Sequence, residues 1–130
     1  MEGIRVLLVD DDEDFRTVLA ERLRMRQLET MAAGSGPEAI AAMQRQPFDV
    51  VVLDLRMPGM DGIEALRQIK EIQPRVEVVL LTGHASMESG IEGMRLGAFD
   101  YLVKPCEIEE LISKIQDACR KSLGEEAGEA

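Results

Sequence analysis

Short runs of aliphatic residues alternate with helical patterns along the whole chain, and this alternation constrains the fold more than any other feature. The third and fourth runs contain the uninterrupted apolar segments Val50–Leu53 and Val78–Leu81, which are typical of parallel strands covered on both faces. Alternation of this kind predicts stacked βα units around one parallel sheet, an α/β fold. The predicted strands are Arg5–Val9, Glu29–Ala32, Asp49–Leu53, Val76–Leu81 and Phe99–Val103.

Helical patterns fill the intervals between these strands. The first and last helices each carry an apolar stripe, and we expect both stripes to pack on the sheet. The stripes are Phe15, Val18, Leu19 and Leu23 in the first helix, and Ile108, Leu111, Ile112, Ile115 and Cys119 in the last. Ser35 and Glu38 form a capping-box pattern that opens the second helix, and Asp61 opens the third. The fourth, over residues 86–96, contains two glycines and is predicted to be the weakest.

Length, charge and cysteine content limit the class of protein. The 130 residues suffice for one domain, which we place at residues 1–121, followed by a flexible tail or linker start at 122–130. A net charge of −10 argues against direct nucleic-acid contact by this domain. Two cysteines without metal-ligand spacing, and no secretory signal pattern, favour a reducing compartment, so we expect a cytoplasmic protein. No apolar stretch approaches the length that spans a bilayer.

Ionisable or hydroxyl side chains stand at the ends of four predicted strands. Asp10 and Asp11 follow the first strand, and Asp54 follows the third. Thr82 and Lys104 follow the fourth and fifth. Because ligands of open α/β sheets bind outside the carboxyl ends of the strands, we expect these five side chains to converge.

The residue types at this edge indicate phosphoryl chemistry. Clustered carboxylates repel one another unless a cation offsets them, and all-oxygen ligands suit Mg²⁺, with Mn²⁺ as an alternative. Lys104 and Thr82 supply a positive charge and a hydroxyl donor for phosphoryl oxygens. An aspartate carboxylate is a competent nucleophile toward phosphorus, and Asp54 stands centrally among these groups. The sequence therefore predicts Asp54 as a phosphoacceptor.

Jointly and in this order, the motifs resemble those of the receiver domain of two-component response regulators, over nearly the whole chain. They are Val9-Asp10-Asp11-Asp12, Asp54 with Met57-Pro58-Gly59-Met60-Asp61-Gly62, Leu81-Thr82-Gly83, and Gly97-Ala98-Phe99-Asp100-Tyr101 leading into Lys104-Pro105. The resemblance implies the flavodoxin-like, doubly wound fold, with five parallel strands in the order 2-1-3-4-5 and helices on both faces.

The same resemblance assigns roles to individual residues. It implies that Asp10, Asp11, Asp54 and the backbone carbonyl of Arg56 bind Mg²⁺. It implies that Thr82 and Tyr101 couple phosphorylation to a change at the surface, and that the Lys104–Pro105 bond is cis, which makes Pro105 a structural residue. Such a domain catalyses only its own phosphorylation and dephosphorylation.

The implied partners are a sensor histidine kinase or phosphotransfer protein, which donates the phosphoryl group, and an output domain or downstream protein. The motif details look most like receivers attached to transcriptional regulators. Whether the chain is a stand-alone receiver or part of a longer regulator is open at this point, as is a homodimer. No membrane partner is expected.

Several alternatives remain at this point. The acidic triplet leaves open which two carboxylates face the ion, and Asp12 has the helix start as its other place. Asp10 and Asp12 also match the Asp-x-Asp pair of haloacid-dehalogenase-type phosphatases, although the further acidic metal motif of that family is missing. A flavodoxin-like cofactor binder is disfavoured by the scarcity of aromatics and of a phosphate loop. Arg56 and His84 occupy positions from which the resembling family tunes hydrolysis of the acyl phosphate.

Overall fold

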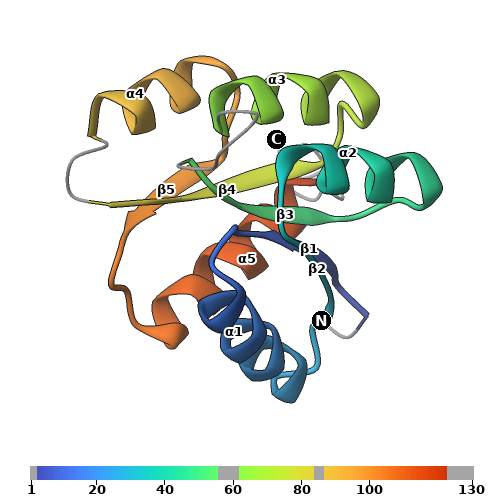
Figure 1. The fold of residues 1–130 in the computed structure, drawn as a ribbon, viewed down its shortest axis with the longest axis vertical. Coiled ribbons are helices and arrows are strands. Elements are labelled where there is room, and N and C mark those ends of the chain that lie inside the picture. The colour runs from blue at the N-terminus through green and yellow to red at the C-terminus, as the bar shows by residue number, and fades with distance from the viewer. Residues whose placement is uncertain (1–2, 56–61, 84–86, 123–130) are drawn as a thin grey trace.

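One parallel sheet organises the molecule (Figure 1). This computed structural model describes residues 3–55, 62–83 and 87–122, with the backbone alone for residues 87–90 and 122. The strand order is β2-β1-β3-β4-β5, so the predicted α/β class and strand order are confirmed. The strands are β1 (Arg5–Val9), β2 (Glu29–Ala33), β3 (Val50–Asp54), β4 (Glu77–Thr82) and β5 (Asp100–Val103).

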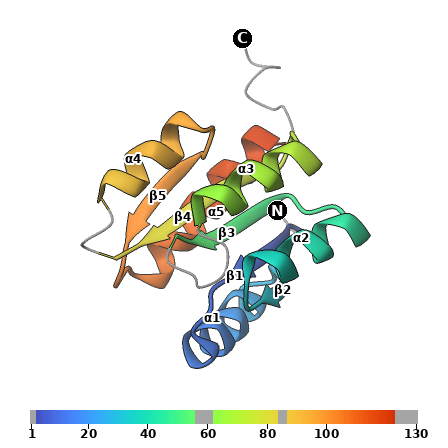
Figure 2. The same ribbon diagram turned by 45° about the horizontal axis from the view of Figure 1, so that its top comes forward.

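Helices cover both faces of the sheet and complete three layers (Figures 1 and 2). Helices α1 and α5 lie on one face, while α2, α3 and α4 lie on the other. The helices are α1 (Glu13–Met25), α2 (Gly36–Arg45), α3 (Gly62–Ile72), α4 (Met87–Arg95) and α5 (Ile108–Ser122). None of those described combines the length and apolar character needed to cross a bilayer.

The central strand β3 shows why the uninterrupted apolar runs were required. Every residue of β3 is buried, because side chains alternate between two cores that lie on opposite faces of the sheet. Val50 and Val52 face the core beneath α1 and α5, whereas Val51 and Leu53 face the core beneath α2 and α3. The carboxyl end of β3 is thus held rigidly from both sides.

Local signals set the helix starts. Ser35 Oγ accepts a hydrogen bond from the Glu38 amide at 3.2 Å, and the Glu38 carboxylate accepts one from the Gly34 amide. The predicted capping box is therefore present, with the glutamate reaching one residue further than the ideal motif. Helix α3 begins at Gly62, where a Cβ atom would collide with the Leu55 backbone, so only glycine fits. The predicted opening residue Asp61 lies outside the described residues.

The prediction for α1 was wrong in part. Leu19 and Leu23 are buried as expected, but Phe15 and Val18 are 36% and 49% exposed. They lie toward the end of the sheet at which the carboxyl ends of the strands meet, called here the carboxyl edge. There they line a groove with Pro105, Cys106 and Ile108 instead of packing in the core. Helical spacing identifies a stripe, but it does not say how far along the helix the sheet reaches.

Candidate functional site

Asp10 directly follows β1 and is fully buried, and other residues bond to both its backbone and its side chain. Its amide donates to the Ala33 carbonyl at 3.1 Å, and its own carbonyl accepts from the Arg16 guanidinium at 2.8 Å. One carboxylate oxygen accepts from the Asp12 amide at 2.9 Å. These contacts hold the Asp10 carboxylate at the carboxyl edge of the sheet. Its second oxygen pairs with the Lys104 ammonium.

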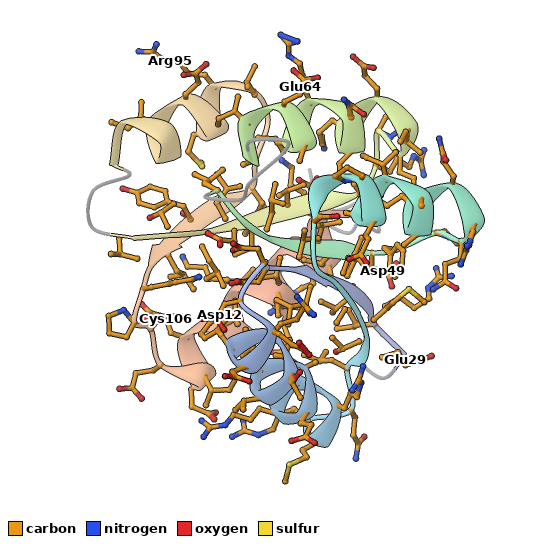
Figure 3. All side chains as sticks on the ribbon, in the orientation of Figure 1. Asp12, Glu29, Asp49, Glu64, Arg95 and Cys106 are labelled. Carbon is orange, nitrogen blue, oxygen red and sulfur yellow. The ribbon has the colours of Figure 1, made fainter. Side chains whose placement is uncertain are left out.

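Asp12 performs a structural task next to the site. Its side chain accepts a hydrogen bond from the Phe15 amide at 3.1 Å, which makes Asp12 the N-cap of α1. Figure 3 shows it at the start of that helix. An N-cap carboxylate satisfies an otherwise unpaired amide and interacts favourably with the helix dipole. Of the two places that the sequence left open for Asp12, the helix start is the one observed.

The remaining carboxylates of the edge come together. One oxygen each from Asp10, Asp11 and Asp54 lie within 4.8 Å of one another. Asp10 and Asp54 are buried while Asp11 is exposed, so the cluster is open on one side. Three carboxylates at this separation attract a cation, and their oxygen chemistry fits Mg²⁺ or Mn²⁺. The predicted fourth ligand, the Arg56 carbonyl, lies outside the described residues.

Lys104 supplies the positive charge that the structure places against this cluster. Its ammonium lies 2.9 Å from an Asp10 oxygen and 3.7 Å from an Asp54 oxygen. The Lys104–Pro105 bond is cis, as predicted. The Lys104 amide donates to the Thr82 carbonyl at 2.7 Å, which anchors the residue to β4. One ammonium offsets about one of three negative charges, so room for a further cation remains.

Thr82 carries the most telling polar atom of the site. Its side chain is 1% exposed, and its hydroxyl has no hydrogen-bond partner among the described residues. A buried hydroxyl without a partner costs free energy, and such groups are rare in native proteins. Thr82 ends β4 two strands from Asp10 and one strand from Asp54. The hydroxyl is therefore available to a ligand bound at this edge.

Other predicted residues are placed differently. Tyr101 lies on β5 opposite Leu80 and packs, partly exposed, against the core beneath α2 and α3. His84 lies outside the described residues. Sequence reasoning missed Arg16, which holds the Asp10 carbonyl, and the ring of Phe15, which lies 4.5 Å from the Lys104 ammonium. Their position in the first turns of α1, nearest the acidic cluster, was the available signal.

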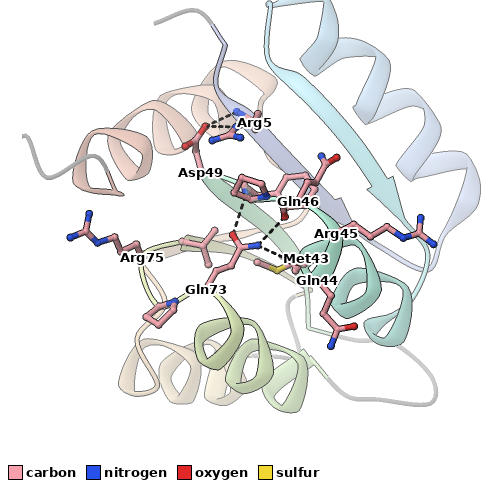
Figure 4. Close-up of a pocket in the computed structure, with 12 residues that line it drawn as sticks. Arg5, Met43, Gln44, Arg45, Gln46, Asp49, Gln73 and Arg75 are labelled. Atoms are coloured by element: carbon pink, nitrogen blue, oxygen red, sulfur yellow. Dashed lines mark hydrogen bonds and ion pairs between the residues drawn. The ribbon is translucent and has the colours of Figure 1, made fainter.

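A hollow also lies at the opposite end of the sheet, where the amino ends of the strands meet, called here the amino edge (Figure 4). It encloses about 610 Å³ between the ends of α2 and α3. The side chain of Gln73 crosses it, donating to the Met43 and Gln46 carbonyls and accepting from the Phe48 amide. The polar groups of Gln73 are thus used internally, and the carboxyl edge is the better candidate site.

Comparison with known proteins agrees with this geometry. A family model described as the response regulator receiver domain matches residues 6–116. Regulatory protein AtoC of Escherichia coli is 39% identical over 114 residues, which cover 88% of this chain and 25% of AtoC. The DNA-binding transcriptional regulator NtrC of Salmonella typhimurium is 38% identical over 113 residues, which cover 87% of this chain and 24% of NtrC. The chain thus spans about a quarter of the length of these relatives.

Solved structures give the same answer. A response regulator receiver domain protein from Clostridium thermocellum superposes with a TM-score of 0.87 at 33% identity, covering 92% of this chain and 98% of that one. NtrX from Brucella abortus superposes with a TM-score of 0.91 at 32% identity, and the match covers 98% of this chain and 30% of the NtrX chain. The chain belongs to the response regulator receiver domain family of two-component systems.

Proposed function

We propose that this chain is a phosphoacceptor receiver in which Asp54 takes a phosphoryl group from the phosphohistidine of a sensor kinase or phosphotransfer protein. The proposal rests on the convergence of carboxylate, ammonium and hydroxyl groups at the carboxyl edge. Buried Asp54 lies within reach of two further carboxylates, 3.7 Å from the Lys104 ammonium, at the edge where the Thr82 hydroxyl has no partner among the described residues. Each of these groups suits a different oxygen of a bound phosphoryl group.

The proposed reaction assigns a task to each side chain. An Asp54 carboxylate oxygen attacks phosphorus and forms an acyl phosphate O–P bond, while the P–N bond to the donor imidazole breaks and the electron pair leaves with the imidazole nitrogen. Lys104 exchanges its contact with Asp54 for one with a phosphoryl oxygen. The Thr82 hydroxyl donates to another.

The metal site proposed for the same reaction uses the carboxylates of Asp10, Asp11 and Asp54 and the backbone carbonyl of Arg56. Bound Mg²⁺ offsets negative charge on the transferring phosphoryl group, and Mn²⁺ is the alternative ion. Asp10 is held ready by the Arg16 and Asp12 contacts to its carbonyl and carboxylate. The exposed side of the cluster, at Asp11, leaves the ion a path from solvent.

The competing enzyme assignment loses support at Asp12. That assignment rests on the Asp-x-Asp pair formed by Asp10 and Asp12. Here the side chain of Asp12 caps α1. We therefore propose that the domain acts on itself alone, catalysing its own phosphorylation and dephosphorylation, and turns over no external metabolite.

A surface for a donor protein lies beside the proposed acceptor. The groove lined by Phe15, Val18 and Ile108 borders Lys104 and exposes apolar side chains beside the acceptor, which suits docking of a donor protein. We propose that residues 1–121 form the folded receiver and that it acts in the cytoplasm. The transcriptional regulators among its relatives suggest that Thr82 and Tyr101 transmit phosphorylation to an output domain or downstream protein.

The direct test is phosphorylation by acetyl phosphate, a small donor that needs no kinase. Intact mass should show one phosphoryl adduct in the wild type with Mg²⁺, and none after chelation. Asp54→Asn should show no adduct, while the matched variant Asp49→Asn, at the other end of β3, should behave as wild type. An adduct that persists in Asp54→Asn would move the acceptor elsewhere, with Asp10 examined first.

A further inference from the structure

Phe15 is the aromatic residue of α1 and does not belong to either core. Its side chain is 36% exposed, although it stands on the apolar stripe of the helix. The ring lies 4.5 Å from the Lys104 ammonium, within the range of a cation–π contact. Since Phe15 is half-exposed, apolar burial alone does not account for its place, and its contact with Lys104 is the feature to explain.

Lys104 has carboxylates on one side and the ring on the other. Its ammonium lies 2.9 Å from Asp10 and 3.7 Å from Asp54, and its side chain is 27% exposed. A lysine stem has four rotatable bonds and much rotamer freedom, so a partly exposed ammonium samples water as well as the site. The face of an aromatic ring attracts a cation and also excludes water from that side. The ring therefore restricts Lys104 to positions over the carboxylates.

We propose that Phe15 is a positioning residue for Lys104, which it holds over the acceptor before the phosphoryl group arrives. This inference rests on the proposed function, in which Lys104 binds a phosphoryl oxygen. Loss of the ring should release the lysine stem, so part of the ordering must then occur during the reaction. Transfer to Asp54 becomes slower, although neither the acceptor nor the metal ligands have changed.

A docking role for the same surface must be separated from positioning. Val18 lies one helical turn after Phe15, lines the same groove and is 49% exposed, but it carries no ring. A small donor does not dock on the groove, so only positioning affects its reaction. Val18→Ala is therefore the matched control, and acetyl phosphate is the donor that separates the two roles.

The experiment compares Phe15→Leu, Phe15→Tyr and Val18→Ala in the 130-residue chain. With acetyl phosphate and Mg²⁺, Phe15→Leu should phosphorylate about two- to fivefold more slowly than wild type, the factor that corresponds to a partly exposed cation–π contact. Phe15→Tyr keeps the ring and should restore the wild-type rate. Val18→Ala should match wild type. Thermal unfolding of each variant checks that the fold is kept.

A spectroscopic readout makes the test independent of phosphorylation. The ε-protons of Lys104 should show an upfield ring-current shift in NMR spectra, lost in Phe15→Leu and kept in Phe15→Tyr. Lys121, whose ammonium lies 5.8 Å from the Phe99 ring, serves as an internal comparison that Phe15→Leu leaves unchanged. This readout decides the contact even if the wild type gives no adduct, a result that would contradict the proposed function separately.

Two results would overturn the inference. Phe15→Leu could phosphorylate as fast as wild type, which would mean that Lys104 needs no ring to hold it. Alternatively, Phe15→Tyr could be as slow as Phe15→Leu, which would show that the shape of the side chain matters and its π-face does not.

Discussion

The two edges of the sheet differ in how their polar groups are used. At the amino edge, one side chain, Gln73, makes three hydrogen bonds across a hollow of about 610 Å³ (Figure 4). At the carboxyl edge, three carboxylates gather within 4.8 Å, and the buried Thr82 hydroxyl has no partner among the described residues. The polar atoms of Gln73 bond to neighbouring backbone groups, whereas the carboxyl edge gathers like charges that need a cation to offset them. This difference in charge and bonding, more than the size of a hollow, distinguishes the two edges.

Glu77 refines this comparison because it is a buried polar group at the amino end of β4. One of its oxygens has no partner among the described residues, but the other lies 3.8 Å from the Lys121 ammonium. Its charge is therefore balanced by a neighbour on α5. An unsatisfied atom alone does not define a site. At the carboxyl edge, the one such atom among the described residues, Thr82 Oγ1, shares the edge with three clustered carboxylates.

Replacing a lysine at each edge should give the largest contrast. Lys104→Met removes the ammonium that faces Asp54 and should slow phosphorylation by acetyl phosphate about 100-fold, the usual cost of losing one stabilising group in a charged transition state. Lys70 instead donates to the Pro74 and Val76 carbonyls at the amino edge. Lys70→Met should lower the free energy of unfolding by about 1 kcal/mol and leave the rate unchanged. Equal phosphorylation rates in the two variants would contradict a functional difference between the two edges.

Gln73→Ala should separate stability from activity. It leaves the Phe48 amide and the Met43 and Gln46 carbonyls without their partner, so the free energy of unfolding in urea should fall by about 2 kcal/mol. Phosphorylation below the unfolding transition should be unaffected. Gln68→Ala, which removes a single bond to Glu64, is the matched control and should cost less than about 0.5 kcal/mol. A loss of phosphorylation in folded Gln73→Ala would contradict the division between the edges.

Two buried threonines test the meaning of the unpartnered hydroxyl. Thr30 Oγ1 donates to the Leu28 carbonyl at 3.0 Å, so Thr30→Val should cost about 1 kcal/mol of unfolding free energy. Thr82→Val removes a hydroxyl with no described partner and should cost nothing, or stabilise slightly. Only Thr82→Val should slow phosphorylation. If Thr82→Val destabilised as much as Thr30→Val, its hydroxyl would have a partner in the resting protein.

Cys106 gives the smallest expected effect at the carboxyl edge. Burial raises the pKa of its thiol, and the negative charge of Glu110 raises it further. Less thiolate is therefore present at neutral pH, and alkylation by iodoacetamide should be slower than for a free cysteine. Glu110→Gln lowers the pKa of this thiol and should speed alkylation about twofold. The reaction is followed on the Cys106 peptide, because Cys119 is buried. A rate unchanged by Glu110→Gln would remove the electrostatic part of this explanation.

Much of the site could be predicted from the sequence because the residue at which a strand ends can be read from the order of residues along the chain. Once Asp10, Asp54 and Thr82 were assigned to the ends of parallel strands, the sheet itself brought them to one edge. The strand ends were accurate to about one residue. Strands β3 and β4 end at Asp54 and Thr82, one residue later than predicted.

The contacts made by α1 could not be placed in the same way. Helical spacing identified a stripe containing Phe15 and Val18, but their exposure depends on where the helix extends past the sheet. The Arg16 contact with the Asp10 carbonyl depends on the same three-dimensional offset. Periodicity gives the direction of a side chain around a helix axis and not the neighbour that it meets.

NMR mapping of the wild type with Mg²⁺ and beryllofluoride, which mimics a phosphoryl group on a carboxylate, tests the carboxyl edge directly. Backbone amide shifts should be largest at Asp10, Asp11, Asp54, Thr82 and Lys104, and absent at Phe48 and Gln73. Asp54→Asn should lose the beryllofluoride-dependent shifts. Shifts centred on the amino-edge hollow, or unchanged by Asp54→Asn, would contradict the claim that the carboxyl edge receives the phosphoryl group.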